Sequence, residues 1–348
     1  MKAILWELID KNKKIIKCNL CARRCLIPNN SKGFCLVRKN ENGNLKAIYY
    51  GKIIAENVDP IEKKPLFHFY PSHLSYSIAL PSCNFACEFC CNYQISQCLR
   101  ENFPFFVLER EPEEIVESAI KLNCFSISYT YTEPTIHIEF AKDVGKLAKK
   151  KGLKNIFVTN GYLTPEAVKE ISKFLDAATV DVKGNGDDEF YKKLMKVPSS
   201  QPIFDALLEM KRKKIHIEIT DLVFPKYGDS VEKAKKLAKW IVDNLGPETP
   251  LHFIQFFPSY KILDLPRTPI ETLEKHAKIA KEEGLKFVYI GNVPGHPLEN
   301  TYCPNCGKAV IKRYSIYVLE WNLDDKNRCK YCKTKISITG KLLKNEMD

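Results

Sequence analysis

The middle of the chain, from about residue 74 to 292, alternates between short apolar runs and longer amphipathic stretches. Apolar runs that end in polar or turn residues predict strands at 74–80, 125–131, 155–159, 178–183, 215–224, 251–257 and 286–290. Apolar residues at helical spacing predict helices at 112–121, 137–151, 165–174, 201–213, 229–244 and 269–283. Such alternation implies an α/β fold with a parallel sheet and right-handed crossovers. The pattern gives six to seven strand–helix units, and a complete (β/α)8 barrel contains eight.

Both ends of the chain break this pattern and carry grouped cysteines. The first group has the spacing C-x2-C-x3-C-x9-C and consists of Cys18, Cys21, Cys25 and Cys35. The last group contains two C-x2-C pairs and consists of Cys303, Cys306, Cys329 and Cys332. We therefore predict an N-terminal metal-binding module at 1–60, a barrel at 74–292 and a C-terminal zinc-ribbon module at 300–348.

The spacing within these two groups favours different metals. Two C-x2-C pairs around a short predicted hairpin are typical of a zinc ribbon. Because metal binding would make its folding local, we expect the barrel to fold without this module. The N-terminal group fits structural zinc or a second 4Fe–4S cluster, and its spacing does not decide between them. The alternative, a set of unligated thiols, is weaker for four cysteines so close together.

Composition and charge limit the setting of the protein. The 348 residues are 45% hydrophobic and 28% charged, which suits a large core rather than disorder. The start of the chain does not resemble a signal peptide, and no apolar run is long enough to cross a membrane. Grouped cysteines without a secretion signal favour metal sites over disulfides. We therefore expect a reduced, cytoplasmic protein without a membrane partner.

The formal net charge is +12, but many of the lysine and arginine residues lie at the carboxyl ends of predicted helices. Cations at helix carboxyl ends are favourable because they oppose the helix dipole. No recognisable nucleic-acid-binding module accompanies the charge. The charge therefore does not favour a nucleic-acid partner, although RNA is kept as an alternative.

The central cysteine motif gives the strongest chemical signal. Cys83, Cys87 and Cys90 have the spacing C-x3-C-x2-C and lie on a loop that follows the strand predicted at 74–80. Three thiolates on a 4Fe–4S cluster would leave one iron open to the amino and carboxylate groups of S-adenosylmethionine (SAM). An electron from the cluster could then cleave SAM to a 5′-deoxyadenosyl radical. The alternatives are a zinc knuckle or buried thiols, and Cys91 competes with Cys90 as the third ligand.

At these residues the chain resembles the radical SAM superfamily. That family has an aromatic residue before the third cysteine, as Phe89 is here, and Asn92 stands where pyruvate formate-lyase activating enzymes carry an asparagine. The resemblance implies an open partial (β/α)6 barrel related to the TIM barrel, a 4Fe–4S cluster and SAM. It also implies an oxidoreductase that abstracts hydrogen from a substrate.

The predicted strand ends supply further site candidates, because ligands of parallel barrels bind at the carboxyl ends of strands. Resemblance to the pyruvate formate-lyase activating enzymes implies that Glu133 receives the SAM ammonium, although Tyr131 and Thr132 replace two glycines there. In those enzymes two aspartates help bind a monovalent cation beside the SAM carboxylate. Since Val158 replaces one of them here, we expect Lys183 to neutralise that carboxylate directly. The other cofactor-binding candidates are Thr159, Asn160, Asp181, Thr220 and His252. For His252, a surface histidine at the start of a strand is an equal alternative.

Five motifs together resemble the radical SAM member of the AmmeMemoRadiSam group, which is defined by association with two other proteins. They are the cysteine loop, Asp59–Leu66 (DPIEKKPL), Tyr131–Pro134 (YTEP), Gly291–Gly295 (GNVPG) and Asn300–Pro304 (NTYCP). This resemblance covers nearly the whole chain but supplies no reaction.

Three functions follow from these observations. The first is hydrogen abstraction from an unknown substrate, with a glycine of a protein as one hypothesis, driven by a reductant such as ferredoxin or flavodoxin. The second is modification of RNA, although base-stacking motifs are lacking. The third is a zinc-dependent scaffold without redox chemistry, which the central cysteines and the polar strand ends argue against.

Overall fold

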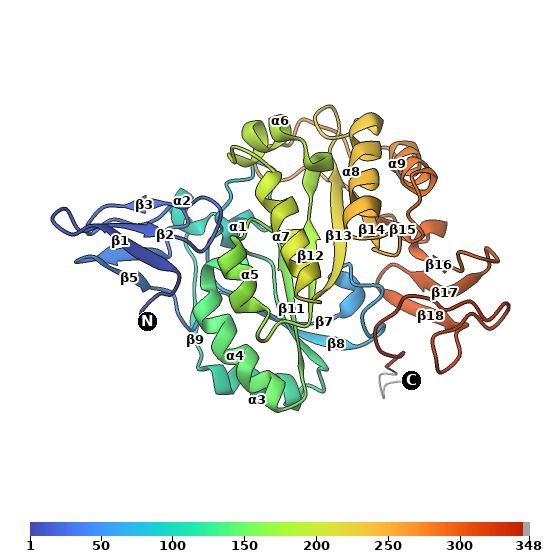
Figure 1. Ribbon diagram of the computed structural model, residues 1–348, viewed down its shortest axis with the longest axis horizontal. Helices are drawn as coiled ribbons and strands as arrows, with labels where there is room; N and C mark the ends of the chain where they lie inside the picture. The colour runs from blue at the N-terminus through green and yellow to red at the C-terminus, as the bar shows by residue number, and fades with distance from the viewer. Residues whose placement is uncertain (344–348) are drawn as a thin grey trace.

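The computed structural model describes residues 1–343 and has one large sheet at its centre (Figure 1). The eight strands of this sheet follow the order β15-β14-β13-β12-β11-β10-β8-β7, and all pairs are parallel except β7 with β8. The strands are β7 (Ala55–Pro60), β8 (Leu74–Ala79), β10 (Ser126–Tyr129), β11 (Lys154–Thr159), β12 (Ala177–Asp181), β13 (His216–Val223), β14 (Leu251–Gln255) and β15 (Val288–Gly291).

Six helices connect consecutive parallel strands and pack against the sheet (Figure 1). They are α3 (Pro112–Lys121), α4 (Ile138–Lys150), α5 (Pro165–Ile171), α7 (Gln201–Arg212), α8 (Val231–Asn244) and α9 (Ile270–Glu282). Thr164 caps the start of α5, since its side chain accepts a hydrogen bond from the N–H of Ala167. The predicted strands and helices are confirmed to within a few residues. The sheet is an open partial barrel of six strand–helix units plus a seventh parallel strand, β15.

Short helical turns lie in the loops. They are η1 (Ile61–Lys63), α1 (Tyr93–Ser96), α2 (Cys98–Glu101), η2 (Pro134–His137), η3 (Lys183–Gly186), α6 (Asp188–Phe190), η4 (Tyr191–Met195) and η5 (Pro297–Glu299). None of the helices within residues 1–343 is long and apolar enough to cross a membrane.

The two cysteine-rich modules lie at opposite ends of the long axis (Figure 1). The N-terminal module contains β1 (Trp6–Asp10), β2 (Ile15–Cys18), β3 (Leu26–Ile27) and the hairpin of β4 (Arg38–Glu41) and β5 (Asn44–Ala47). β6 (Lys52–Ile53) pairs with β9 (Leu108–Glu109) beside it. The C-terminal module contains β16 (Thr301–Tyr302), β17 (Ala309–Tyr314) and β18 (Tyr317–Trp321) as an antiparallel sheet.

The segment between β7 and β8 fills the lower part of the partial barrel. The backbone N–H groups of Phe67 and His68 donate to the two carboxylate oxygens of Glu218, at 3.0 and 2.7 Å. His252 and His216 contact the same carboxylate at 2.8 and 3.1 Å. Burial would raise the pKa of Glu218, but these hydrogen bonds hold it well below its ordinary value. This network lies in the amino-terminal halves of β13 and β14.

Candidate active site at the carboxyl ends of the strands

A cavity of about 570 Å³ opens at the carboxyl ends of the parallel strands. This volume lies within the range of cofactor and small-molecule sites. Eleven of the residues predicted for the central site line it: Cys83, Cys87, Phe89, Cys90, Asn92, Glu133, Thr159, Asn160, Asp181, Lys183 and Thr220. The structure therefore brings together residues from four strand ends and the cysteine loop.

The three cysteines of the central motif face this cavity with their thiols spread apart. The Sγ atom of Cys83 accepts hydrogen bonds from the N–H of Phe85 at 3.3 Å and from the Asn160 amide at 3.8 Å. The three sulfur atoms of this motif, which lies within the described residues, are not all within 4.8 Å of one another. Sulfur ligands of one tetrahedral ion would lie that close. Thiolates that bind different irons of a cluster stand farther apart, so the arrangement fits a 4Fe–4S cluster.

Burial makes these cysteines costly to ionise without a metal. It raises the pKa of the Cys87 thiol to about 12 and that of the Cys83 thiol well above its ordinary value. Both thiols are therefore neutral near pH 7 until iron displaces their protons.

Glu133 connects the ends of β10 and β11. Its carboxylate accepts hydrogen bonds from the Thr159 hydroxyl at 2.7 Å, the Asn160 N–H at 2.8 Å and the Thr135 N–H at 3.0 Å. The last of these caps the start of η2. Burial nevertheless raises the pKa of Glu133 above its ordinary value. The carboxylate thus lines the cavity and also holds two strand ends together.

The ends of β12 and β13 form a second polar group in the cavity. The Lys183 ammonium and the Thr220 hydroxyl donate to different oxygens of the Asp181 carboxylate. Burial would lower the pKa of Lys183, but the attraction of Asp181 outweighs it and the pKa is raised. Lys183 is therefore a cation with donors left for an anionic group of a ligand.

The loop after β10 takes a backbone conformation that glycine favours. Tyr131, which stands where the activating enzymes have a glycine, has φ at +64°. Its carbonyl accepts a hydrogen bond from the Asn92 amide at 2.9 Å, and its hydroxyl donates to Asp59. These two contacts hold the left-handed conformation in place without a glycine.

His252 does not reach the cavity, so its prediction as a cofactor-binding residue is wrong. β14 begins at Leu251, which places His252 low in the strand, and Ile254 lines the cavity instead. The imidazole is buried, contacts Glu218 and stacks on Tyr289 with ring centroids 4.9 Å apart. Its role is structural, and because the side chain is buried the alternative of a surface histidine is wrong as well.

Among the cavity residues that were not site candidates are two lysines, Lys63 and Lys64. The Lys64 ammonium is buried, lies 2.6 Å from the Asp59 carboxylate and stands 4.5 Å from the centroid of the Tyr131 ring. Burial lowers the pKa of Lys64 to about 8, against the attraction of Asp59. Both lysines belong to the DPIEKKPL motif, which was a usable signal, but only the folded chain shows that this motif meets the YTEP motif.

A 338-residue alignment with an uncharacterized protein of Methanocaldococcus jannaschii is 47% identical and covers 97% of this chain and 99% of that protein. Residues 77–241 match the family model described as the radical SAM superfamily. The chain belongs to the radical SAM superfamily. A second uncharacterized M. jannaschii protein is 26% identical and covers 81% of this chain and 79% of that protein.

Two solved structures illustrate the range of similar chains. Streptococcus suis SuiB bound to SAM has a TM-score of 0.49 and 14% identity, over 67% of this chain and 53% of that chain. A domain of a Bacteroides vulgatus pyruvate-formate lyase-activating enzyme has a TM-score of 0.41 and 18% identity, over 48% of this chain and 99% of that chain.

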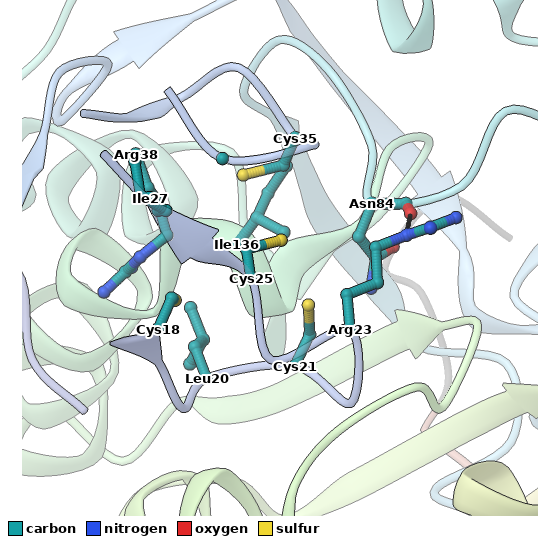
Figure 2. Close-up of a pocket in the computed structure, with 11 residues that line it drawn as sticks. Cys18, Leu20, Cys21, Arg23, Cys25, Ile27, Cys35, Arg38, Asn84 and Ile136 are labelled. Carbon is teal, nitrogen blue, oxygen red and sulfur yellow. Dashed lines mark hydrogen bonds between the residues drawn. The ribbon is translucent and has the colours of Figure 1, made fainter. Parts of the chain in front are cut away.

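The C-terminal cysteines of this radical SAM protein form a compact four-thiol group. All four Sγ atoms lie within 4.8 Å of one another, with Cys303 and Cys332 at 3.5 Å and Cys306 and Cys329 at 3.8 Å. Four thiolates around one tetrahedral zinc at Zn–S distances of about 2.3 Å would have similar separations. The N-terminal cysteines line a second, smaller pocket (Figure 2).

Proposed function

We propose that this radical SAM enzyme abstracts a hydrogen atom from a polypeptide substrate, with a glycine as the target. We further propose that it is the radical SAM member of the AmmeMemoRadiSam group. The observation that carries the proposal is one cavity that combines three spread thiols with acidic and basic groups on neighbouring strand ends. When bound there, a reduced 4Fe–4S cluster supplies the electron that cleaves SAM and starts hydrogen abstraction.

The residues of the chain would bind and orient SAM. The Lys183 ammonium suits the SAM carboxylate, and the Glu133 carboxylate suits the SAM ammonium, since charge-assisted hydrogen bonds are the stronger kind. The network around Asp181 fixes Lys183 in place. Preorganised groups of this kind lower the cost of binding.

The rim of the cavity supports a large substrate. Lys63, Cys91 and Asn292 line the cavity, are exposed to solvent and come from three separate segments. Asn292 belongs to GNVPG and Lys63 to DPIEKKPL, two of the motifs shared with the AmmeMemoRadiSam group. A loop of a protein can approach such an open rim without entering a closed pocket.

We also propose zinc for the four C-terminal cysteines, a low-potential donor such as ferredoxin or flavodoxin as reductant, and a cytoplasmic location. The short sulfur–sulfur distances support zinc. One electron per cleaved SAM is required from the donor.

The test follows the abstracted atom. The protein is reconstituted anaerobically with iron and sulfide, then incubated with SAM, dithionite and candidate partner proteins labelled with deuterated glycine. Deuterium in 5′-deoxyadenosine supports hydrogen abstraction from a polypeptide. SAM cleavage with deuterium transfer only from labelled RNA would favour the alternative substrate, and zinc without iron in the reconstituted protein would exclude radical chemistry.

A further inference from the structure

The four N-terminal cysteines surround a small enclosed space between β2, β3 and the loop before β4. Cys18, Cys21 and Cys35 are buried and Cys25 is partly buried. Figure 2 shows Cys21, Cys25 and Cys35 directed into the space that they surround. No two of the described cysteines form a disulfide. Four thiols around one space, three of them buried and none in a disulfide, point to a metal centre.

Two buried donors on the walls of this space lack a partner. The Nε atom of Arg38 and the Nδ2 atom of Asn84 have no hydrogen-bond acceptor in the described chain. Arg38 is 1% exposed and Asn84 is fully buried, and they lie on opposite sides of the space (Figure 2). Buried N–H groups without acceptors are costly, so an acceptor beside these walls would stabilise the fold.

The positive charge around the space also favours a negatively charged metal centre. The Arg38 guanidinium forms a buried ion pair with Glu139 at 3.0 Å, and its Nη2 donates to the Ile4 carbonyl at 2.7 Å. Arg23 also lines the space and is fixed by the carbonyls of Asn84 and Lys196. Two guanidinium groups beside four thiols favour a centre with net negative charge, as thiolate-bound metals have.

The distances between the sulfur atoms decide which centre fits. The C-terminal cysteines have all four Sγ atoms within 4.8 Å of one another, which suits one tetrahedral ion. Neither the N-terminal cysteines nor the central trio contain three sulfur atoms that close, although every one of these residues is described. The N-terminal thiols, like those of the central trio, are therefore spaced too widely for one tetrahedral ion.

We propose that Cys18, Cys21, Cys25 and Cys35 bind a second 4Fe–4S cluster with a thiolate on every iron. Because no iron is left open, this cluster does not bind SAM. It lies directly beside the radical SAM site, since Asn84 lines the N-terminal space while Cys83 and Phe85 line the central cavity. The Asn84 side chain accepts a hydrogen bond from Asn160 of the central site at 2.7 Å. The proposal does not depend on the substrate proposed above.

The wild-type protein gives the first test, by metal and sulfide analysis with Mössbauer spectroscopy after anaerobic reconstitution. Two clusters predict about eight irons and about one zinc per chain. About four irons with about two zincs would overturn the proposal, and so would about four irons with one zinc.

Two variants then locate the second cluster. In the triple variant Cys83→Ala, Cys87→Ala, Cys90→Ala, about four irons should remain, with an electron-paramagnetic signal that SAM does not change. In Cys21→Ser, iron should fall by about half while the SAM-responsive signal stays. Cys124→Ala, a buried cysteine outside all three groups, is the matched control and should keep the full iron content. Loss of all iron in the triple variant, with Cys124→Ala unchanged, would contradict the assignment.

Discussion

At the scale of single residues, the cysteines differ mainly in what their sulfur atoms can reach. Cys90 lines the cavity and its Sγ lies 3.2 Å from the Ser96 hydroxyl, whereas the adjacent Cys91 is exposed at the rim. The difference between these neighbours makes the choice of third cluster ligand testable.

We predict that Cys83→Ala, Cys87→Ala and Cys90→Ala each abolish SAM cleavage, because a cluster with two protein ligands is not held. Cys91→Ala is the matched control and should retain cleavage. The measurements are 5′-deoxyadenosine formation and the SAM-responsive electron-paramagnetic signal. Cleavage retained in Cys90→Ala but lost in Cys91→Ala would reassign the third ligand.

Lys183 is the cavity cation best placed for a carboxylate. We predict that Lys183→Met weakens SAM binding by about tenfold to a hundredfold, since a charge-assisted hydrogen bond is worth about 1.5–3 kcal/mol. Anaerobic equilibrium dialysis on cluster-loaded protein measures the affinity. Lys192→Met, on the exposed side of η4, should bind SAM like the wild type, and equal affinities in both variants would remove Lys183 from the site.

Glu62 is a buried carboxyl whose protonation should affect stability. One oxygen accepts a hydrogen bond from the Ser72 N–H at 2.8 Å, while the other has no partner in the described chain. Burial raises the pKa of Glu62 from 4.5 to about 7. Since the folded state favours the protonated form, its stabilising contribution is complete below pH 4.5 and is lost as the pH rises through 7.

We therefore predict that Glu62→Gln and the wild type have similar free energies of unfolding near pH 5. At pH 8 the variant should be more stable by roughly 3 kcal/mol, because the wild type must then bury a charge. Chemical denaturation across this pH range measures the difference. For Glu117→Gln, on the exposed face of α3, the difference in unfolding free energy from the wild type should not change with pH. The prediction would be contradicted if this difference were also independent of pH for Glu62→Gln.

At the scale of elements, the site depends on contacts between the ends of neighbouring strands. Glu133 accepts hydrogen bonds from η2 and from residues 159–160 at the end of β11. A loop fixed in this way can present Tyr131 in a left-handed conformation and leave the cavity open beneath it.

We predict that Glu133→Gln lowers the free energy of unfolding by about 1–3 kcal/mol, because the amide nitrogen cannot accept the hydrogen bonds that one carboxylate oxygen now receives. SAM affinity should fall with it, since both strand ends line the site. Thermal melts and equilibrium dialysis give the two quantities. Glu117→Gln, on the exposed face of α3, is the control; a stable Glu133→Gln variant with normal SAM affinity would show that the contact is dispensable.

At the scale of the whole molecule, the C-terminal module shares a hydrophobic core with the barrel. Phe67 and Tyr289 pack together with Val310, Ile311 and Ile336 of the module. The buried Arg313 donates to the Phe67 carbonyl at 3.1 Å and to the Thr301 hydroxyl at 2.8 Å. Removal of the module would expose this core, so the shared packing argues against a barrel that folds well without it.

We predict that deletion of residues 300–348 lowers the melting temperature by more than the loss of one zinc ligand in Cys306→Ser does. Exposure of a large aromatic side chain such as Phe67 costs about 3–5 kcal/mol when truncation to alanine is the guide. Phe67→Ala should therefore reproduce part of the decrease in melting temperature caused by the deletion, while it leaves the metal-binding cysteines unchanged. A deletion variant that melts like the wild type would restore the expectation of an independent module.

The sequence by itself determined the parallel α/β architecture, the three cysteine groups and eleven of the cavity-lining residues. Those features are local: apolar periodicity reports which face of an element is buried, and cysteine spacing reports which thiols can share a centre. Only the tertiary structure decided the role of His252, because the folded chain buries its imidazole against Glu218 and leaves it out of the cavity lining. It also brought Lys64 to Tyr131, 67 residues away along the chain. The spread of the N-terminal thiols was likewise beyond the sequence, since distances between side chains depend on packing that no spacing encodes.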